Sequence, residues 1–221
     1  MILGIYGCGG LGREALEIAR QCNHHSHRWD EILFIDDTPG ETPVNGCRVT
    51  SFEDFQASIP PRRSEICVAV GEPAVRKRLF ERIRQSGYPF TSLVHPSVHI
   101  PESTRIGSGV IIDVYSFISC NTTIGDNVYF QPHSGISHDC VLANHIILSP
   151  GAVVAGNCHI GEGAYIGLNA AVREQTRIGA WSVIGMSAMV CGDVPEEVVV
   201  AGNPAKMMRG NTERRVFRGK S

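Results

Sequence analysis

The sequence predicts a small α/β domain with a parallel sheet, followed by an all-β parallel β-helix of hexapeptide repeats. Three observations support this fold class. Large apolar residues recur at every sixth position through residues 94–194, a strand with a glycine-rich turn and a helix opens the chain, and apolar strands alternate with helical stretches before residue 92. A chain of 221 residues is long enough for one such domain and one repeat array.

The repeat consists of two series that share the period of six. The first holds large apolar residues: Val94, Ile100, Ile106, Ile112, Ile118, Ile124, Phe130, Ile136, Leu142, Leu148, Val154, Ile160, Ile166, Val172, Ile178, Ile184 and Val190. The second begins four positions later, at Val98, and is nearly all small or β-branched. Each hexad predicts one strand and one turn, so three hexads form a triangular coil of about 18 residues. We expect the coils to stack roughly 4.8 Å apart, with the large residues inside.

The composition argues against several classes of function. With 20 basic and 22 acidic residues the formal net charge is −2, which provides no electrostatic case for a nucleic-acid or anionic membrane partner. No apolar run reaches membrane-spanning length and no charged leader precedes the first strand, so we expect no membrane insertion and a cytoplasmic location. The 8 cysteines form no CxxC pair, and we expect them to be reduced, with Cys140 and Cys158 stacked in the interior.

Residues 1–92 are expected to form the α/β domain. The predicted elements are a strand over 2–6, a helix over 13–20, strands over 31–35 and 66–70, and a helix over about 73–85. Between the first strand and helix lies Gly7-Cys8-Gly9-Gly10-Leu11-Gly12, where an anion can approach free backbone N–H groups. This spacing also fits a dinucleotide fingerprint, but the domain lacks a second mononucleotide-binding half. A single nucleotide is therefore favoured over NAD.

Two polar segments are expected to have no catalytic role. His24, His25 and His27 follow the predicted first helix, and a solvated loop is favoured there over a metal site. Residues 208–221 form a basic, aperiodic tail, interpreted as a mobile end or a subunit contact.

The densest group of polar residues in the repeat surrounds His138. A neutral imidazole is suited to removing a proton near pH 7, and a neighbouring carboxylate can orient it. Asp139 is next in the chain, although adjacent residues on a strand point apart. Asp139 is therefore expected either to meet its own His138 at a corner of the coil or to serve the histidine of another subunit.

Five motifs occur in an order that resembles a known family. They are Gly7-Cys8-Gly9-Gly10-Leu11-Gly12-Arg13-Glu14, Phe34-Ile35-Asp36-Asp37, His95-Pro96-Ser97, Ser137-His138-Asp139-Cys140 and Ala201-Gly202-Asn203-Pro204-Ala205-Lys206. Together they resemble the bacterial sugar O-acyltransferase family, which is typified by sialic acid O-acetyltransferases and by N-acetyltransferases of nucleotide-linked 4-amino-4,6-dideoxy sugars. The resemblance covers nearly the whole chain, leaving out the basic tail.

The resemblance implies a left-handed β-helix over residues 93–207, a homotrimer, and acetyl-CoA bound between neighbouring β-helices, with no metal. His138 matches the family's general base and Asp139 the acidic residue after it. The positions that match contacts to acetyl-CoA are Gly156, through a backbone N–H at the oxyanion, and Leu168 and Met186, along the pantetheine arm. The positions that match the nucleotide pocket are Gly7, Gly9, Gly10, Asp36, Asp37 and Gly71.

One position departs from the family pattern. Many relatives have a second histidine at the end of the hexad after the base, where it contacts the substrate or the acetyl group, and Ile147 occupies that position here. The nearby histidine is His145. Either His145 reaches the site from a different angle, or the protein does without that contact.

Several functions remain open on the sequence. The favoured one is N-acetylation of a nucleotide-linked 4-amino-4,6-dideoxy sugar for surface glycan synthesis; the alternatives are sialic acid-type O-acetylation and a non-catalytic, nucleotide-binding trimeric module. A zinc hydratase on the same scaffold needs three histidines. His133 and His138 have the spacing of two of them, but Ser97 stands at the third position.

Overall fold

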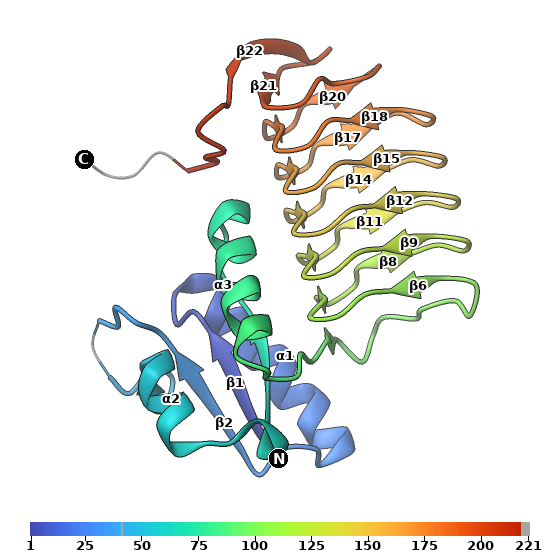
Figure 1. Ribbon diagram of the computed structural model, residues 1–221. Coiled ribbons are helices and arrows are strands. Elements are labelled where there is room, and N and C mark those ends of the chain that lie inside the picture. Colours follow the sequence, from blue (N-terminus) through green and yellow to red (C-terminus); the bar gives the residue numbers. More distant parts are fainter. Residues whose placement is uncertain (41, 218–221) are drawn as a thin grey trace.

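The computed structural model describes residues 1–40 and 42–217, which form an α/β part and a column of stacked coils (Figure 1). The α/β part has four parallel strands in the order β3-β2-β1-β4. Its strands are β1 (Ile2–Tyr6), β2 (Glu31–Ile35), β3 (Val49–Thr50) and β4 (Ser64–Val68). Its helices are α1 (Gly10–Ser26), α2 (Phe52–Ser58), α3 (Pro73–Gln85) and the short 3-10 helix η1 (Pro61–Arg63). The parallel sheet with intervening helices confirms the predicted fold class of this part.

The first helix is longer than the sequence predicted. It begins at Gly10, inside the glycine turn, and continues through His24 and His25, so the expected loop at these two residues is wrong. His27 ends the helix in a left-handed conformation with φ 47°. The helix extends because its packed face continues past Ala19 to Cys22, which packs against the same core cluster one turn later.

The second part is a three-faced β-helix. Face A comprises β5 (Leu93–Val94), β7 (Ile111–Ile112), β10 (Tyr129–Phe130), β13 (Ile147–Leu148), β16 (Tyr165–Ile166), β19 (Val183–Ile184), β21 (Val198–Ala201) and β22 (Lys206–Gly210). Face B comprises β8 (Phe117–Ile118), β11 (Gly135–Ile136), β14 (Val153–Val154), β17 (Ala171–Val172) and β20 (Met189–Val190). Face C comprises β6 (Arg105–Ile106), β9 (Thr123–Ile124), β12 (Val141–Leu142), β15 (His159–Ile160) and β18 (Arg177–Ile178). Apart from the antiparallel end strand β22, neighbouring strands on each face are parallel.

The interior of the coils confirms the two predicted series. The buried core contains the large residues from Ile112 to Val190 together with the small series, and the most interior of them are fully inaccessible to solvent. Cys140 and Cys158 stack as expected, with the Cys158 N–H donating to the Cys140 Sγ at 3.3 Å. Both thiols are free, as are the other cysteines of the described residues. Stacking many coils buries an apolar column that one coil alone leaves exposed.

A third series of period six lies at the corners, and sequence reasoning missed it. From Gly109 to Ser187 the last residue of every corner has a positive φ, and most of these residues are not glycine. Asn occupies the position several times, because its short side chain tolerates the left-handed conformation better than most. We name the corners by the faces they join: corner AB, corner BC and corner CA.

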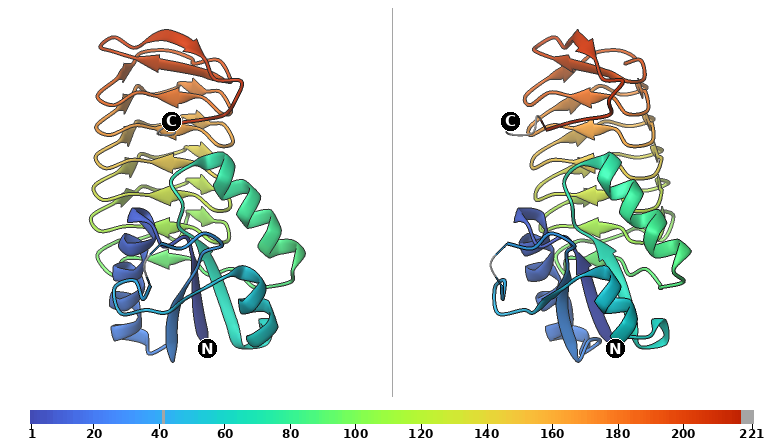
Figure 2. Two further views of the ribbon diagram at one scale, coloured as in Figure 1. Left: turned by 90° about the vertical axis from the view of Figure 1, so that its left-hand side faces the viewer. Right: turned by 60° about the vertical axis from the view of Figure 1, so that its left-hand side comes forward.

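The α/β part packs on the outward side of face A. Outward side chains of that face, such as Ile111 and Tyr129, share one buried cluster with residues of α1 and β1. In Figures 1 and 2, α3 runs beside the column of coils. Arg76 of α3 is fully buried at this junction and donates to the carbonyl oxygens of Val68 and Asn127. Its hydrogen bonds join the α/β part to corner CA, so the two parts are held in a defined relation.

Candidate active site

His138 and Asp139 lie at corner BC, between β11 and β12. The Nδ1 atom of His138 is 2.7 Å from Oδ2 of Asp139, and both side chains are about half exposed. This hydrogen bond lowers the pKa of Asp139, so the carboxylate is the stable form. The pair meets because Asp139 adopts a left-handed conformation with φ 58°, which ends the strand geometry that separates neighbouring side chains. The sequence left open whether Asp139 contacts its own His138 or the histidine of another subunit, and in the structure the contact lies within one chain.

Gly156 lies one coil further along the same corner, directly against the His138 imidazole. A Cβ atom on Gly156 would be 2.7 Å from Cε1 and 2.8 Å from Nε2 of His138, so any larger residue would clash with the imidazole ring in this position. The N–H of Gly156 makes no hydrogen bond to another group within residues 1–40 and 42–217. A free N–H beside a basic ring nitrogen is the arrangement that binds an oxyanion next to a general base.

Leu168 and Met186 lie at a different corner from His138. They occupy equivalent positions at corner AB, one coil apart, and their side chains are 43% and 73% exposed. Because face B separates corner AB from corner BC, one chain does not bring these side chains to the imidazole. They form a ridge of exposed apolar side chains on the other side of face B.

The glycine turn precedes the N-terminus of α1. Gly7 has a φ of 107°, and a Cβ there would be 2.8 Å from Val70, so the turn requires glycine. Gly9 and Gly10 have open space at the Cβ position. No side chain caps the helix, and no acidic residue lies in its first turn, so its N–H groups are free to bind an anion.

The two predicted carboxylates differ in their partners. Asp36 accepts hydrogen bonds from the N–H groups of Cys8 and Thr38, both at 3.0 Å. Burial alone would raise the pKa of Asp36, but these hydrogen bonds lower it below the ordinary value. Asp37 is bound to the Tyr6 hydroxyl at 2.6 Å and to Arg82 at 2.5 Å. Both aspartates line a cavity of about 330 Å³ that also contains Gly7.

A second cavity, of about 340 Å³, lies between the glycine turn and the β-helix, and we call it the junction cavity. It is lined by Gly10, Leu11, Glu14, Gly71, Gln131, Ile147, Pro150, Tyr165, Leu168 and Phe217. Burial, and then the nearby Asp113 carboxylate, raise the pKa of Glu14. Sequence reasoning missed Glu14 and Gln131, although Glu14 lies one helical turn after Gly10 and so faces the same side.

His145 does not reach the junction cavity. It lies at corner CA and is 2% exposed, with Nδ1 2.9 Å from the amide nitrogen of Asn127. Burial lowers its pKa to about 4. Ile147 lies on face A and lines the junction cavity. The position that holds histidine in many relatives is therefore apolar here, and His145 is a buried structural residue.

The candidate metal ligands are dispersed. His133 lies at corner AB and His138 at corner BC, while the Ser97 hydroxyl is 2.8 Å from Nδ1 of His95. The part of the chain that the structure describes contains no group of three His, Cys, Asp or Glu side chains placed to hold a metal ion. In the same residues, none of the helices has the length and apolar character needed to cross a bilayer.

Comparisons with known proteins identify relatives for both parts. The model of the PglD N-terminal domain family matches residues 3–83. GDP-perosamine N-acetyltransferase of Escherichia coli O157:H7 is 34% identical over 122 residues, which cover 55% of this chain and only 55% of that relative. The match therefore spans about half the length of that relative.

Solved structures match over nearly the whole chain. The acetyltransferase domain of PglB from Neisseria gonorrhoeae, in complex with acetyl coenzyme A, is 32% identical with a TM-score of 0.88 and covers 94% of this chain and 98% of its own. PerB from Caulobacter crescentus, in complex with CoA and GDP-perosamine, is 27% identical with a TM-score of 0.86 and covers 94% and 97%. WeeI from Acinetobacter baumannii is 30% identical with a TM-score of 0.87 and covers 94% and 100%. The chain therefore belongs to the bacterial hexapeptide-repeat sugar acyltransferases, in which a PglD-type N-terminal domain precedes a left-handed parallel β-helix.

Proposed function

We propose that the protein is an acetyl-CoA-dependent N-acetyltransferase that modifies a nucleotide-linked 4-amino-4,6-dideoxy sugar for surface glycan synthesis. The observation that carries the proposal is the His138–Asp139 pair beside the free N–H of Gly156. The relatives whose names or complexes include GDP-perosamine and acetyl coenzyme A support this acceptor and donor. The proposal includes a cytoplasmic location, since acetyl-CoA would be the donor.

The proposal gives each group a role. The Nδ1–H of His138 donates to Asp139, which leaves Nε2 free to take a proton from the attacking sugar nitrogen. The Gly156 N–H stabilises the negative charge that develops on the thioester oxygen as the C–N bond forms. When the C–S bond breaks, His138 returns the proton to the departing thiolate. Structures of the C. crescentus perosamine N-acetyltransferase with one histidine substituted also contain CoA and GDP-perosamine.

The two parts of the chain then have separate tasks. Residues 1–92 would hold the nucleotide, with its phosphates at Gly7, Gly9 and Gly10. The positions proposed around the rest of the nucleotide are Asp36, Asp37 and Gly71. Both carboxylates already accept hydrogen bonds, Asp36 from the N–H groups of Cys8 and Thr38 and Asp37 from Tyr6 and Arg82, so each would bind the ligand through its remaining lone pairs. Residues 93–207 would carry the transfer site, with residues 208–221 as an appended tail.

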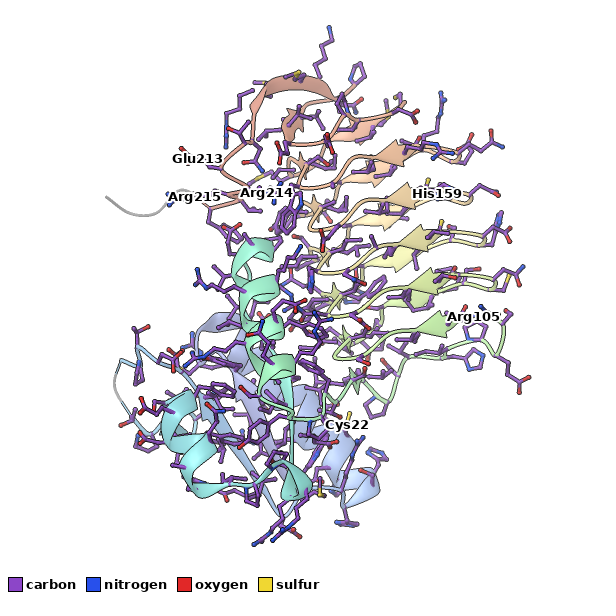
Figure 3. All side chains as sticks on the ribbon, in the orientation of Figure 1. Cys22, Arg105, His159, Glu213, Arg214 and Arg215 are labelled. Atoms are coloured by element: carbon purple, nitrogen blue, oxygen red, sulfur yellow. The ribbon has the colours of Figure 1, made fainter. Side chains whose placement is uncertain are left out.

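A homotrimer would complete the site, because its two halves lie at the two corners that flank face B. Face B has the apolar outward side chains Phe117, Val153 and Met189, with exposed fractions of 61%, 48% and 41%. The outward residues of face C include Arg105, His159 and Arg177 (Figure 3 labels the first two). Three copies with face B toward a threefold axis would bring corner BC of one copy against corner AB of the next. His138 would then face the neighbour's Leu168, Met186 and junction cavity.

The first test is acetyl transfer measured by mass spectrometry. Acetyl-CoA is offered with GDP-, UDP- and dTDP-linked 4-amino-4,6-dideoxy sugars and with free and CMP-linked sialic acids. We expect one acetyl group to be added to one nucleotide amino sugar by the wild type, and a fall of about 10²–10⁴-fold in kcat/KM for His138→Ala. Transfer to a sialic acid alone would establish O-acetylation. Absence of transfer to every acceptor would favour the binding-module alternative.

A complementation experiment tests the shared site. Gly10→Glu puts a carboxylate at the phosphate position without a steric clash, because nothing lies within 4 Å of its Cβ. His138→Ala and Gly10→Glu chains are each inactive alone. If base and pocket come from neighbouring copies, random co-assembly restores about a quarter of the wild-type activity, since each site needs one intact half from each of two chains. If the mixed chains recover no activity, or if the active protein is a monomer by light scattering, the shared site is contradicted.

A further inference from the structure

The C-terminal segment 211–217 returns from the end of the β-helix toward the α/β part (Figure 2). Its first contact is Asn211, which is 3% exposed and donates through Nδ2 to the carbonyl oxygen of Trp181 at 2.9 Å. Arg214 donates twice to Oε1 of Glu197, at 2.9 and 2.8 Å, and its guanidinium lies 4.9 Å from the centre of the Trp181 ring. Figure 3 shows Glu213, Arg214 and Arg215 near one end of α3. The described part of the tail therefore makes specific contacts with the β-helix through Asn211 and Arg214.

The segment is then held by Glu72, the residue before α3. The N–H groups of Val216 and Phe217 donate to the Glu72 carboxylate at 2.9 and 3.1 Å. Glu72 occupies the N-cap position but its side chain caps none of the N–H groups of α3. Pro73 follows it at the first helical position and has no N–H to cap. The carboxylate is thus free to bind the backbone of the tail.

Phe217 ends the described segment at the junction cavity. Its ring meets Tyr165 edge to face, with centroids 5.7 Å apart at an interplanar angle of 82°. A Cβ atom on Gly71 would lie 3.5 Å from the Phe217 ring, so the glycine and the aromatic side chain form adjacent parts of the same wall. Phe217 is 53% exposed and lines the junction cavity.

The wall that Phe217 completes is mainly apolar. Leu11, Ile147 and Leu168 line the same cavity, and its side chains with polar groups are Glu14, Gln131 and Tyr165. A hydroxyl group buried against the apolar wall would lose its hydrogen bonds to water without replacement. A methyl group placed there would gain from burial. The cavity therefore favours a sugar whose edge at this wall carries no hydroxyl.

We propose that Phe217 is a specificity-determining residue for the acceptor and that the C-terminal segment brings it to the apolar edge of the sugar ring, at the deoxygenated C6 position. This inference rests on the proposed function, since it concerns the acceptor of that reaction. Glu72 acts as a positioning residue, because it accepts hydrogen bonds from the backbone of Val216 and Phe217 but does not itself line the junction cavity.

The experiment compares Phe217→Ala with wild type, with Phe217→Leu as the conservative variant and Arg215→Ala as the matched control in the same segment. The Arg215 side chain is exposed and does not line the junction cavity. Each protein is assayed with the 4-amino-4,6-dideoxy acceptor that the wild type uses and with its C6-hydroxylated counterpart. Binding of both sugars without acetyl-CoA is measured by calorimetry.

We expect Phe217→Ala to lower kcat/KM for the deoxy acceptor about tenfold or more and to leave the hydroxylated one within about threefold, so that discrimination falls. The KM for acetyl-CoA stays unchanged, Phe217→Leu restores most of the preference, and Glu72→Ala follows Phe217→Ala. If the wild type is active and Phe217→Ala keeps the same ratio of kcat/KM for the deoxy and hydroxylated acceptors, this inference is overturned while the proposed function stands. Wild type that neither transfers to nor binds any of these sugars would overturn both.

Discussion

Replacing Gly156 with alanine tests whether the position of the His138 ring limits the reaction. The new Cβ would lie 2.7 Å from Cε1 of His138, whereas ordinary contact begins at 3.4 Å. The ring must therefore retreat by roughly 0.7 Å, and misplacement by about 1 Å at a reacting centre costs on the order of 10²-fold. We expect kcat/KM to fall about 30- to 100-fold. The backbone is not strained by the change, because Gly156 does not have a positive φ.

Gly192 supplies the matched control for this variant. It lies in the turn that follows β20, at the same edge of face B two coils further on, where the corner is two residues shorter. Among the described residues, nothing lies within 4 Å of the Cβ it would gain. Gly192→Ala should keep wild-type kcat/KM, and both variants should keep the wild-type thermal midpoint within a few degrees. Steady-state kinetics with acetyl-CoA and the acceptor, together with thermal unfolding, measure both quantities. Wild-type kinetics in Gly156→Ala, or an equal loss in Gly192→Ala, would refute the reasoning.

Two further predictions concern stability. Burial lowers the pKa of His145 to about 4, whereas histidine in the unfolded chain titrates near 6.5. Between these pH values the unfolded state binds more protons than the folded state. The free energy of unfolding therefore falls as the pH drops from about 6.5 to 4. Asparagine tolerates the left-handed conformation, so His145→Asn should weaken the pH dependence of the unfolding free energy, measured by urea titrations at several pH values. An equally steep pH dependence in the variant would show that another group causes it. Arg76→Met removes buried hydrogen bonds to the carbonyl oxygens of Val68 and Asn127 and should cost about 1–3 kcal/mol in chemical denaturation, because buried acceptors are left unsatisfied. Arg84→Met, on the exposed side of the same helix, should cost under about 1 kcal/mol, and equal losses would contradict the assigned role of Arg76.

The repeat was predictable because the inside of a coil accepts only one kind of residue at each position. A large apolar side chain at every sixth residue, such as Ile136 or Leu142, is required wherever a strand points inward. The corners follow a weaker rule, since the left-handed position accepts Asn157 and Gly163 but also Tyr115 and Trp181. Their common property is a backbone angle, which residue type only partly specifies.

The sequence predicted which residues lie at corner BC but not how they are arranged. The adjacency of His138 and Asp139 indicated a base and its orienting carboxylate, yet alternation along a strand argued against their contact. The positive φ of Asp139 removes that objection, and it is a consequence of the corner. The junction cavity was less accessible to sequence reasoning, because Glu14, Gln131 and Phe217 come from three distant segments with no shared period.

The proposed division of the site between two corners would explain why the sequence indicates the parts of the site but not how they come together. His138 and Gly156 belong to corner BC, while Leu168 and the junction cavity belong to corner AB, and face B lies between them. Within one chain these groups are related only by the regular six-residue period of the repeat. That period does not indicate which surface contacts a second copy. The apolar outward side of face B is the feature that relates the two corners, because covering it with a second copy also joins the two halves. Assembly and catalysis would thus depend on the same surface, so a polar substitution on face B, such as Val153→Lys, should remove transfer activity along with the trimer.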